Sequence, residues 1–111
     1  AAVGINMNMS PVLDVNSNPS NPVIGDRAFG ATPHLVSELG VATVGGLQDN
    51  RVVACGKHFP GHGDTTSDSH KELPVVTAAR HRLDQHQAET LQIARETETI
   101  RVEKHLALPV S

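Results

Sequence analysis

The apolar run Val52–Gly56 restricts the fold of this chain more than any other segment. Its side chains are continuously apolar, which is typical of a parallel strand buried on both faces. Parallel strands cannot be joined by a tight hairpin and need a crossover connection, usually a helix. We therefore expect an α/β chain in which helices precede and follow this strand.

The remaining segments supply such an alternation. Residues 1–15 alternate apolar and polar side chains and predict a first strand. A helix is expected from Thr32 and Pro33, which suit the N-cap and the first helical position, to about Asn50. Its predicted apolar stripe consists of Leu35, Leu39, Ala42, Gly46 and Leu47. A second helix over 78–95 and a last strand over 99–108 complete the order, which indicates a parallel sheet of βαβ units.

Two polar loops interrupt this pattern. Residues 16–30 are rich in Asn, Ser, Pro and Gly, and residues 57–74 are rich in Gly, Pro, His and Asp. Each loop follows the predicted carboxyl end of a strand, where α/β barrels and doubly wound sheets place their sites. We therefore expect the functional residues in these two segments.

Size and composition exclude several classes of protein. A chain of 111 residues forms one domain at most, and we expect it to be part of a longer protein. Its net charge of -3 and its only two aromatic residues argue against nucleic-acid binding. No apolar stretch is long enough for a membrane span. The single cysteine, Cys55, excludes an internal disulfide and is expected to be a buried, inert thiol.

The segment 57–70 concentrates residues that could carry chemistry. It holds three of the seven histidines, whereas His34, His81 and His86 lie in polar segments and are expected to be solvated. Asp68 and His70 are two residues apart, so the carboxylate could hold the ring and stabilise its charged form. A metal site is the alternative, with the candidate ligands His58, His62, Asp64, Asp68 and His70. From the residue types alone, proton transfer, a metal site and a structural loop all remain open.

Taken as a whole, the loop resembles the signature of glycoside hydrolase family 3, in its β-N-acetylglucosaminidase branch. The matching residues are Lys57-His58-Phe59-Pro60-Gly61-His62-Gly63-Asp64-Thr65, followed by Asp68-Ser69-His70. Residues 6–16 resemble the strand before the site in that family, and residues 21–30 resemble its substrate-binding loop. Residues 105–109 resemble a later strand end.

The resemblance implies part of a TIM-type (β/α)₈ barrel, with about three of its βα units in residues 1–111. The implied reaction is retaining hydrolysis of terminal β-linked N-acetylglucosamine from oligosaccharides or cell-wall fragments. By the same resemblance His70 is the acid/base, paired with Asp68, while Arg27, Lys57 and His58 hold sugar hydroxyls. No cofactor is implied; the partners are the saccharide and the remainder of the barrel, and a bacterial cytoplasmic location is favoured.

Three hypotheses about activity follow. The first is the retaining glycosidase, whose nucleophile is expected on a strand beyond His105; phosphorolysis is a close variant of it. The second is a metal-dependent hydrolase that uses the His/Asp loop. The third is a non-catalytic fragment of the barrel, because an isolated part exposes sheet edges and a core face. Asp14, at the end of the first predicted strand, receives no role in any of them.

Overall fold

The computed structural model of the chain describes residues 2–59, 61–75 and 101–104. The elements, in order, are β1 (Met7–Asn8), the 3₁₀ turn η1 (Gly25–Arg27), α1 (Pro33–Asp49), β2 (Val53–Phe59) and β3 (Arg101–Lys104). The predicted second helix over 78–95, with His81 and His86, lies outside these residues. Among the described residues, no helix is both long enough and apolar enough to cross a membrane.

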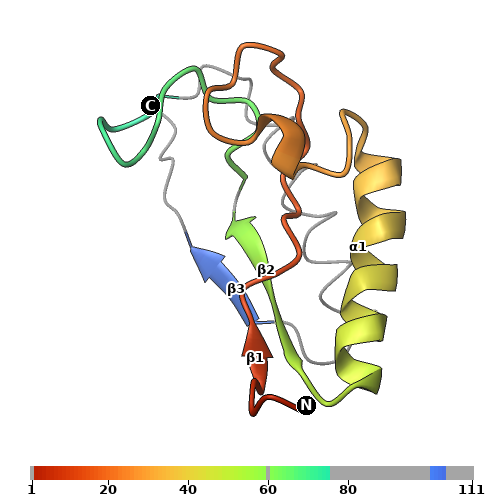
Figure 1. Cartoon of the computed structure of the whole chain (residues 1–111). Helices are drawn as coiled ribbons and strands as arrows, with labels where there is room; N and C mark the ends of the chain where they lie inside the picture. Colours follow the sequence, from red (N-terminus) through yellow and green to blue (C-terminus); the bar gives the residue numbers. More distant parts are fainter. Residues whose placement is uncertain (1, 60, 76–100, 105–111) are drawn as a thin grey trace.

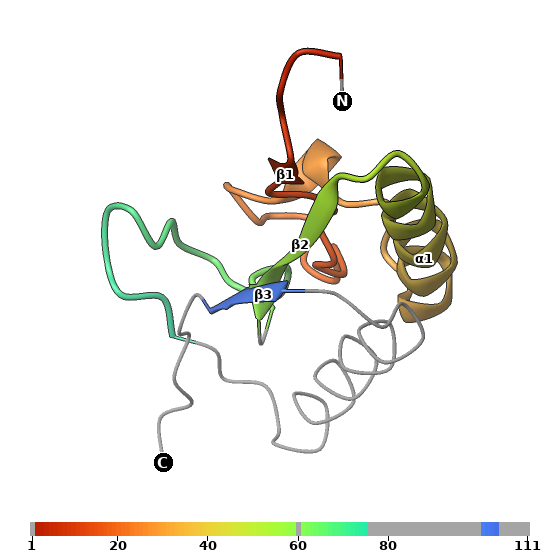
Figure 2. The same ribbon diagram turned by 90° about the horizontal axis from the view of Figure 1, so that it is seen from below.

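The three strands form one parallel sheet in the order β1-β2-β3. Figure 1 shows the three arrows pointing the same way, with α1 running back beside the sheet in the opposite direction. Figure 2, seen from below, shows the sheet and α1 as two neighbouring layers. The predicted parallel α/β arrangement is therefore confirmed, and helix α1 is the crossover between β1 and β2.

Strand β2 lies between β1 and β3 and combines buried apolar residues with a polar end. Ala54 and Cys55 are 0% and 3% exposed, which confirms the buried thiol. The strand is longer than the predicted Val52–Gly56 run and continues through Lys57 and His58 to Phe59. The two polar residues at this end are thereby held by the sheet instead of by a free loop.

Strand β1 is much shorter than the predicted 1–15 segment, and the irregular pairing there has a simple cause. Val53 N donates to Asn6 O, and the next hydrogen bond of β2 runs from Cys55 N to Ser10 O. Between these two hydrogen bonds the first segment advances by four residues and β2 by only two. Pro11 has no N–H to add to a ladder. Regular pairing stops there and resumes as a single parallel bridge between Val12 and Lys57.

Helix α1 begins at Pro33 as predicted, but the predicted apolar stripe is wrong. Thr32 is the N-cap, although its hydroxyl makes no capping hydrogen bond. The buried positions are Val36, Gly40 and Val44, whereas Leu35 and Leu39 are 39% and 38% exposed. Small and β-branched side chains let the helix approach the sheet closely, and this selects a different face from the one the leucines mark. His34 is exposed, as expected.

The described core lies between α1, the sheet and the segment after β1. Leu13, Val15 and Val36 form its centre, and Phe29 and Val41 pack against it. The loop 14–30 therefore contributes Val15 and Phe29 to the core, and these apolar contacts hold it in place.

We expect Val44→Ala to lower the free energy of unfolding of the full-length protein that carries this chain by about 2 kcal/mol, because Val44 is fully buried. Denaturant unfolding followed by circular dichroism measures this. Glu38→Ala, on the exposed face of the same helix, is the control and should change stability by less than about 0.5 kcal/mol. Equal losses for the two variants would contradict the packing of α1 described above.

Candidate active site

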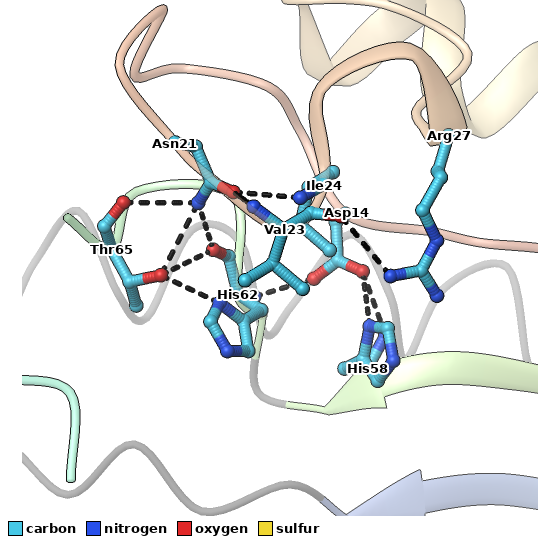
Figure 3. A network of polar contacts seen from close by, with 8 residues as sticks. All are labelled: Asp14, Asn21, Val23, Ile24, Arg27, His58, His62 and Thr65. Carbon is cyan, nitrogen blue, oxygen red and sulfur yellow. Dashed lines mark hydrogen bonds and ion pairs between the residues drawn. The ribbon is translucent and has the colours of Figure 1, made fainter. Parts of the chain in front are cut away.

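The polar segments that follow β1 and β2 meet at the carboxyl ends of the strands. Figure 1 shows residues 14–30 and the loop 61–75 above the tips of β1 and β2. The sequence predicted that these two polar loops follow the carboxyl ends of strands, and the described residues confirm that placement. The two segments are joined by a set of buried hydrogen bonds, shown in Figure 3.

Asp14 lies at the centre of these contacts and is 1% exposed. Its Oδ2 accepts from the backbone N of His58 at 3.1 Å and contacts Nδ1 of the same residue at 2.6 Å. Its Oδ1 accepts from the backbone N of His62. A buried carboxylate is costly unless it is paired and hydrogen-bonded, and here both oxygens are satisfied.

Asn21 forms a second centre a short distance along the loop. Its Oδ1 accepts from Val23 N and Ile24 N at 2.9 and 2.7 Å, which fixes the chain entering η1. Its Nδ2 donates to His62 O at 2.7 Å and to Thr65 O at 3.0 Å. One buried amide therefore ties the turn that carries Arg27 to the base of the loop that carries Asp68 and His70.

Thr65 and His62 complete the base of this loop. Thr65 is 0% exposed, and its hydroxyl lies 2.6 Å from His62 Nδ1 and 2.9 Å from His62 O. Ser17 Oγ donates to Asp64 Oδ1 at 2.8 Å, and Asn18 N donates to Gly63 O. We call residues 62–65 the loop base. The side chains of His62, Asp64 and Thr65 each contact another protein group at hydrogen-bond distance.

Glycine at position 63 is required by a close approach of two backbones. A Cβ atom built there would lie 1.8 Å from the carbonyl oxygen of Val15. No side-chain movement relieves a clash with backbone. The segment after β1 and the loop base can therefore touch only because residue 63 has no side chain.

The predicted sugar-binding residues lie at different depths. His58 is 9% exposed and Lys57 is partly buried, both at the end of β2. Arg27 is exposed on η1, and its Nη1 donates to Val23 O at 3.2 Å. Within the described part of the chain Arg27 makes no ion pair with Asp14 or Asp26, so its charge is not neutralised by a neighbouring carboxylate there.

The predicted acid/base pair is in contact on an exposed turn. Asp68 Oδ1 accepts from the backbone N of His70 at 2.9 Å and lies 2.8 Å from its ring Nδ1. The His70 side chain is 74% exposed. The backbone N–H of His70, and then its ring, hold the pKa of Asp68 below its ordinary value. Asp68 is therefore a carboxylate that orients the His70 ring.

The metal alternative finds no support in this geometry. Among residues 2–59, 61–75 and 101–104, no three His, Cys, Asp or Glu side chains are grouped as ligands for one ion. His58 faces Asp14, Asp64 faces Ser17 and the Nδ1 of His62 faces Thr65. Three of the candidate ligands thus make hydrogen bonds to other protein groups, and Asp68 and His70 contact each other.

Sequence reasoning missed Asp14, Asn21 and Thr65. Asp14 ends a strand and Asn21 stands in a Pro- and Ser-rich loop, where both look like ordinary turn residues. The partners of Asp14, and those of the Asn21 Nδ2 group, lie 41 to 48 residues away in sequence, so no local pattern signals these contacts.

Several known proteins are similar to this chain in both sequence and structure. Residues 1–102 match the family described as "Glycosyl hydrolase family 3 N terminal domain". Beta-hexosaminidase A of Pseudoalteromonas piscicida is 49% identical over 84 residues, which are 76% of this chain and 14% of that protein. The family 3 beta-N-acetylglucosaminidase from Paenibacillus sp. str. FPU-7 superposes with a TM-score of 0.82 at 53% identity, covering 86% of this chain and 18% of that one. NagZ from Neisseria gonorrhoeae, solved in complex with N-trifluoroacetyl-D-glucosamine, gives 0.79 at 36% identity, covering 92% and 30%.

Parallel strands with polar loops at their carboxyl ends are the architecture of a barrel-type hydrolase domain. The chain belongs to glycosyl hydrolase family 3, and its three parallel strands are part of a TIM-type barrel. It spans between 14% and 30% of the length of the three relatives above.

We expect Gly63→Ala to destabilise the full-length protein by about 3 kcal/mol or more, because the new methyl group would meet the Val15 carbonyl. Gly46→Ala is the matched control: a Cβ there meets nothing within 4 Å, and alanine is the better helix former by about 0.5–1 kcal/mol. Thermal unfolding of both variants measures the difference. A tolerated Gly63→Ala would disprove the close approach.

Proposed function

We propose that the protein is a retaining β-N-acetylglucosaminidase, with residues 1–111 forming part of its N-terminal catalytic barrel domain. It releases terminal β-linked N-acetylglucosamine from oligosaccharides or cell-wall fragments. The observation that carries this proposal is the Asp68–His70 pair on the loop after β2. The names of two relatives support the sugar, and the Neisseria enzyme was solved with an N-acylated glucosamine.

His70 is suited to act first as an acid and then as a base. In the first step the ring donates a proton to the glycosidic oxygen as the bond to the sugar breaks and a nucleophile attaches to the anomeric carbon. In the second step the neutral ring takes a proton from water, whose oxygen displaces the nucleophile. Asp68 contacts Nδ1, so proton transfer uses Nε2 and the carboxylate stabilises the charged ring. The nucleophile is assigned to no residue of this chain.

The exposure of His70 fits a group that must reach a bound sugar. The pair stands on a turn in which Lys71 N and Glu72 N both donate to Asp68 O, so the turn has its own hydrogen bonds. It can therefore approach the sugar as a unit while the loop base stays in place.

Arg27, Lys57 and His58 supply the hydrogen bonds that hold the sugar. Arg and Lys offer several donors; Arg27 comes from η1 and Lys57 from the carboxyl-terminal part of β2. In the described part of the chain no carboxylate neutralises the charge of Arg27, so its guanidinium is suited to binding the hydroxyls of a sugar.

His70→Ala in the full-length protein should reduce turnover of substrates with poor leaving groups by about 10²–10⁴-fold, because such groups need the proton. Aryl N-acetylglucosaminides with acidic phenols should lose far less in the glycosylation step. Pre-steady-state and steady-state rates on both substrate types measure this. Ser69→Ala, in the same turn, is the control and should leave both rates near the wild-type values. Equal losses for both leaving groups would refute the acid role.

The Asp68 carboxyl should titrate below its ordinary value of 3.8, because His70 N–H and the His70 ring favour the charged form. A lowered folded-state pKa means that the turn is stabilised above the unfolded value and loses this stabilisation as the pH falls through the folded pKa. Carboxyl carbon NMR shifts follow the titration. His70→Ala removes only the ring, so the pKa should rise part of the way and the backbone contribution should remain. A pKa that His70→Ala leaves unchanged would show that the ring is not a partner.

A further inference from the structure

The contact between Asp14 and His58 has a feature that sugar binding by His58 alone does not explain. The same carboxylate oxygen meets the backbone N and the ring Nδ1 of His58, at 3.1 and 2.6 Å. The pair is buried, with side chains 0% and 10% exposed. Two contacts from one oxygen fix both the position of the residue and the rotation of its ring.

The hydrogen-bonding capacity of the groups decides where the proton of His58 lies. Both oxygens of Asp14 already accept from backbone N–H groups, those of His58 and His62, so the carboxylate acts as an acceptor. Nδ1 must then carry a hydrogen and donate it to Oδ2. In the neutral ring Nε2 consequently holds a lone pair, and a sugar hydroxyl that reaches it donates to it.

We propose that Asp14 is a positioning residue for sugar recognition: it holds His58 in the Nδ1–H tautomer, so that the ring accepts a hydrogen bond from a substrate hydroxyl. This inference rests on the proposed sugar-binding role of His58. Arg27 and Lys57 are obligatory donors, and a histidine acceptor beside them adds a group of the opposite kind. A hydroxyl both donates and accepts, so such a mixed set recognises it better than donors alone.

The second oxygen of Asp14 extends the same effect to the loop base. It binds the backbone N of His62, which begins the base that Asn21 and Thr65 secure. Asp14 therefore contributes to the placement both of His58 and of the loop that leads to Asp68 and His70.

The first test examines the tautomer in the wild-type full-length protein. Nitrogen-15 labelling of histidine and two-bond nitrogen–proton couplings distinguish Nδ1–H from Nε2–H rings, and the missing signals in His58→Ala assign the resonance. The Nδ1–H pattern is expected for His58. An Nε2–H pattern would overturn the proposal, and this measurement needs no folded Asp14 variant and no assay.

The second test is a double-mutant cycle with an aryl N-acetylglucosaminide. Asp14→Asn keeps the shape, but its NH2 group must replace one of the two oxygens that accept backbone N–H groups, so the side chain no longer holds the His58 ring in one tautomer and we expect KM to rise about 10-fold with a smaller change in kcat. In a His58→Ala background the same change should add little, because the group it acts through is gone. Val44→Ala controls for lost stability alone and should leave KM unchanged.

The outcomes separate this proposal from the function it rests on. If His58→Ala raises KM and Asp14→Asn does not, the positioning role fails and the sugar-binding role stands. If His58→Ala leaves KM unchanged, the sugar-binding role fails and the recognition half of the proposal fails with it. Equal effects of Asp14→Asn in both backgrounds would show a general structural loss and would also overturn it.

Discussion

The buried carboxylate of Asp14 is the interaction on which the rest of the site depends. A carboxyl group at 1% exposure is tolerated only where polar partners replace water, and three do so here: the backbone N–H groups of His58 and His62 and the ring Nδ1 of His58. Two of them belong to the end of β2 and one to the loop base. Strand β1 itself has only two residues, so the Asp14 side chain adds to the backbone hydrogen bonds that join the first segment to the second.

The residues of the site around Asp14 range from buried to solvent-exposed. Asp14, His58, His62 and Thr65 are buried, while Arg27 and His70 face solvent. Asn21 lies at the boundary, because its amide holds the entry to η1 on one side and the loop base on the other. In the function proposed above, this arrangement would fix the depth at which the sugar binds and leave His70 able to move toward it.

The sequence predicted those features that local patterns determine. The apolar run of β2, the start of α1 at Pro33 and the Asp68–His70 contact each depend on residues within a few positions of one another. The described part of the chain also confirms that the loops gather at the carboxyl ends of the strands. Of the strand predicted over 99–108, the structure describes Arg101–Lys104, which form β3.

The features that were missed depend on contacts between distant segments. The buried face of α1 is lined by Val36, Gly40 and Val44, and only the shape of the opposing sheet shows that small side chains belong there. β1 ends early because the pairing slips before Pro11, and a register slip is a property of two strands, not one. Asp14 has no role until His58, 44 residues later, lies beside it.

The contact between Gly63 and the Val15 carbonyl has a consequence for how this protein can vary between species. The backbones of Val15 and Gly63 are in contact, and the side chains of Asp14, Ser17, Asn18 and Asn21 all bond to residues 62–65. One segment therefore cannot shift without the other. Drift at residues 14–21 would therefore have to be matched by drift at residues 62–65. Within the family, these two stretches should co-vary as one evolutionary unit, while the neighbouring exposed positions diverge freely.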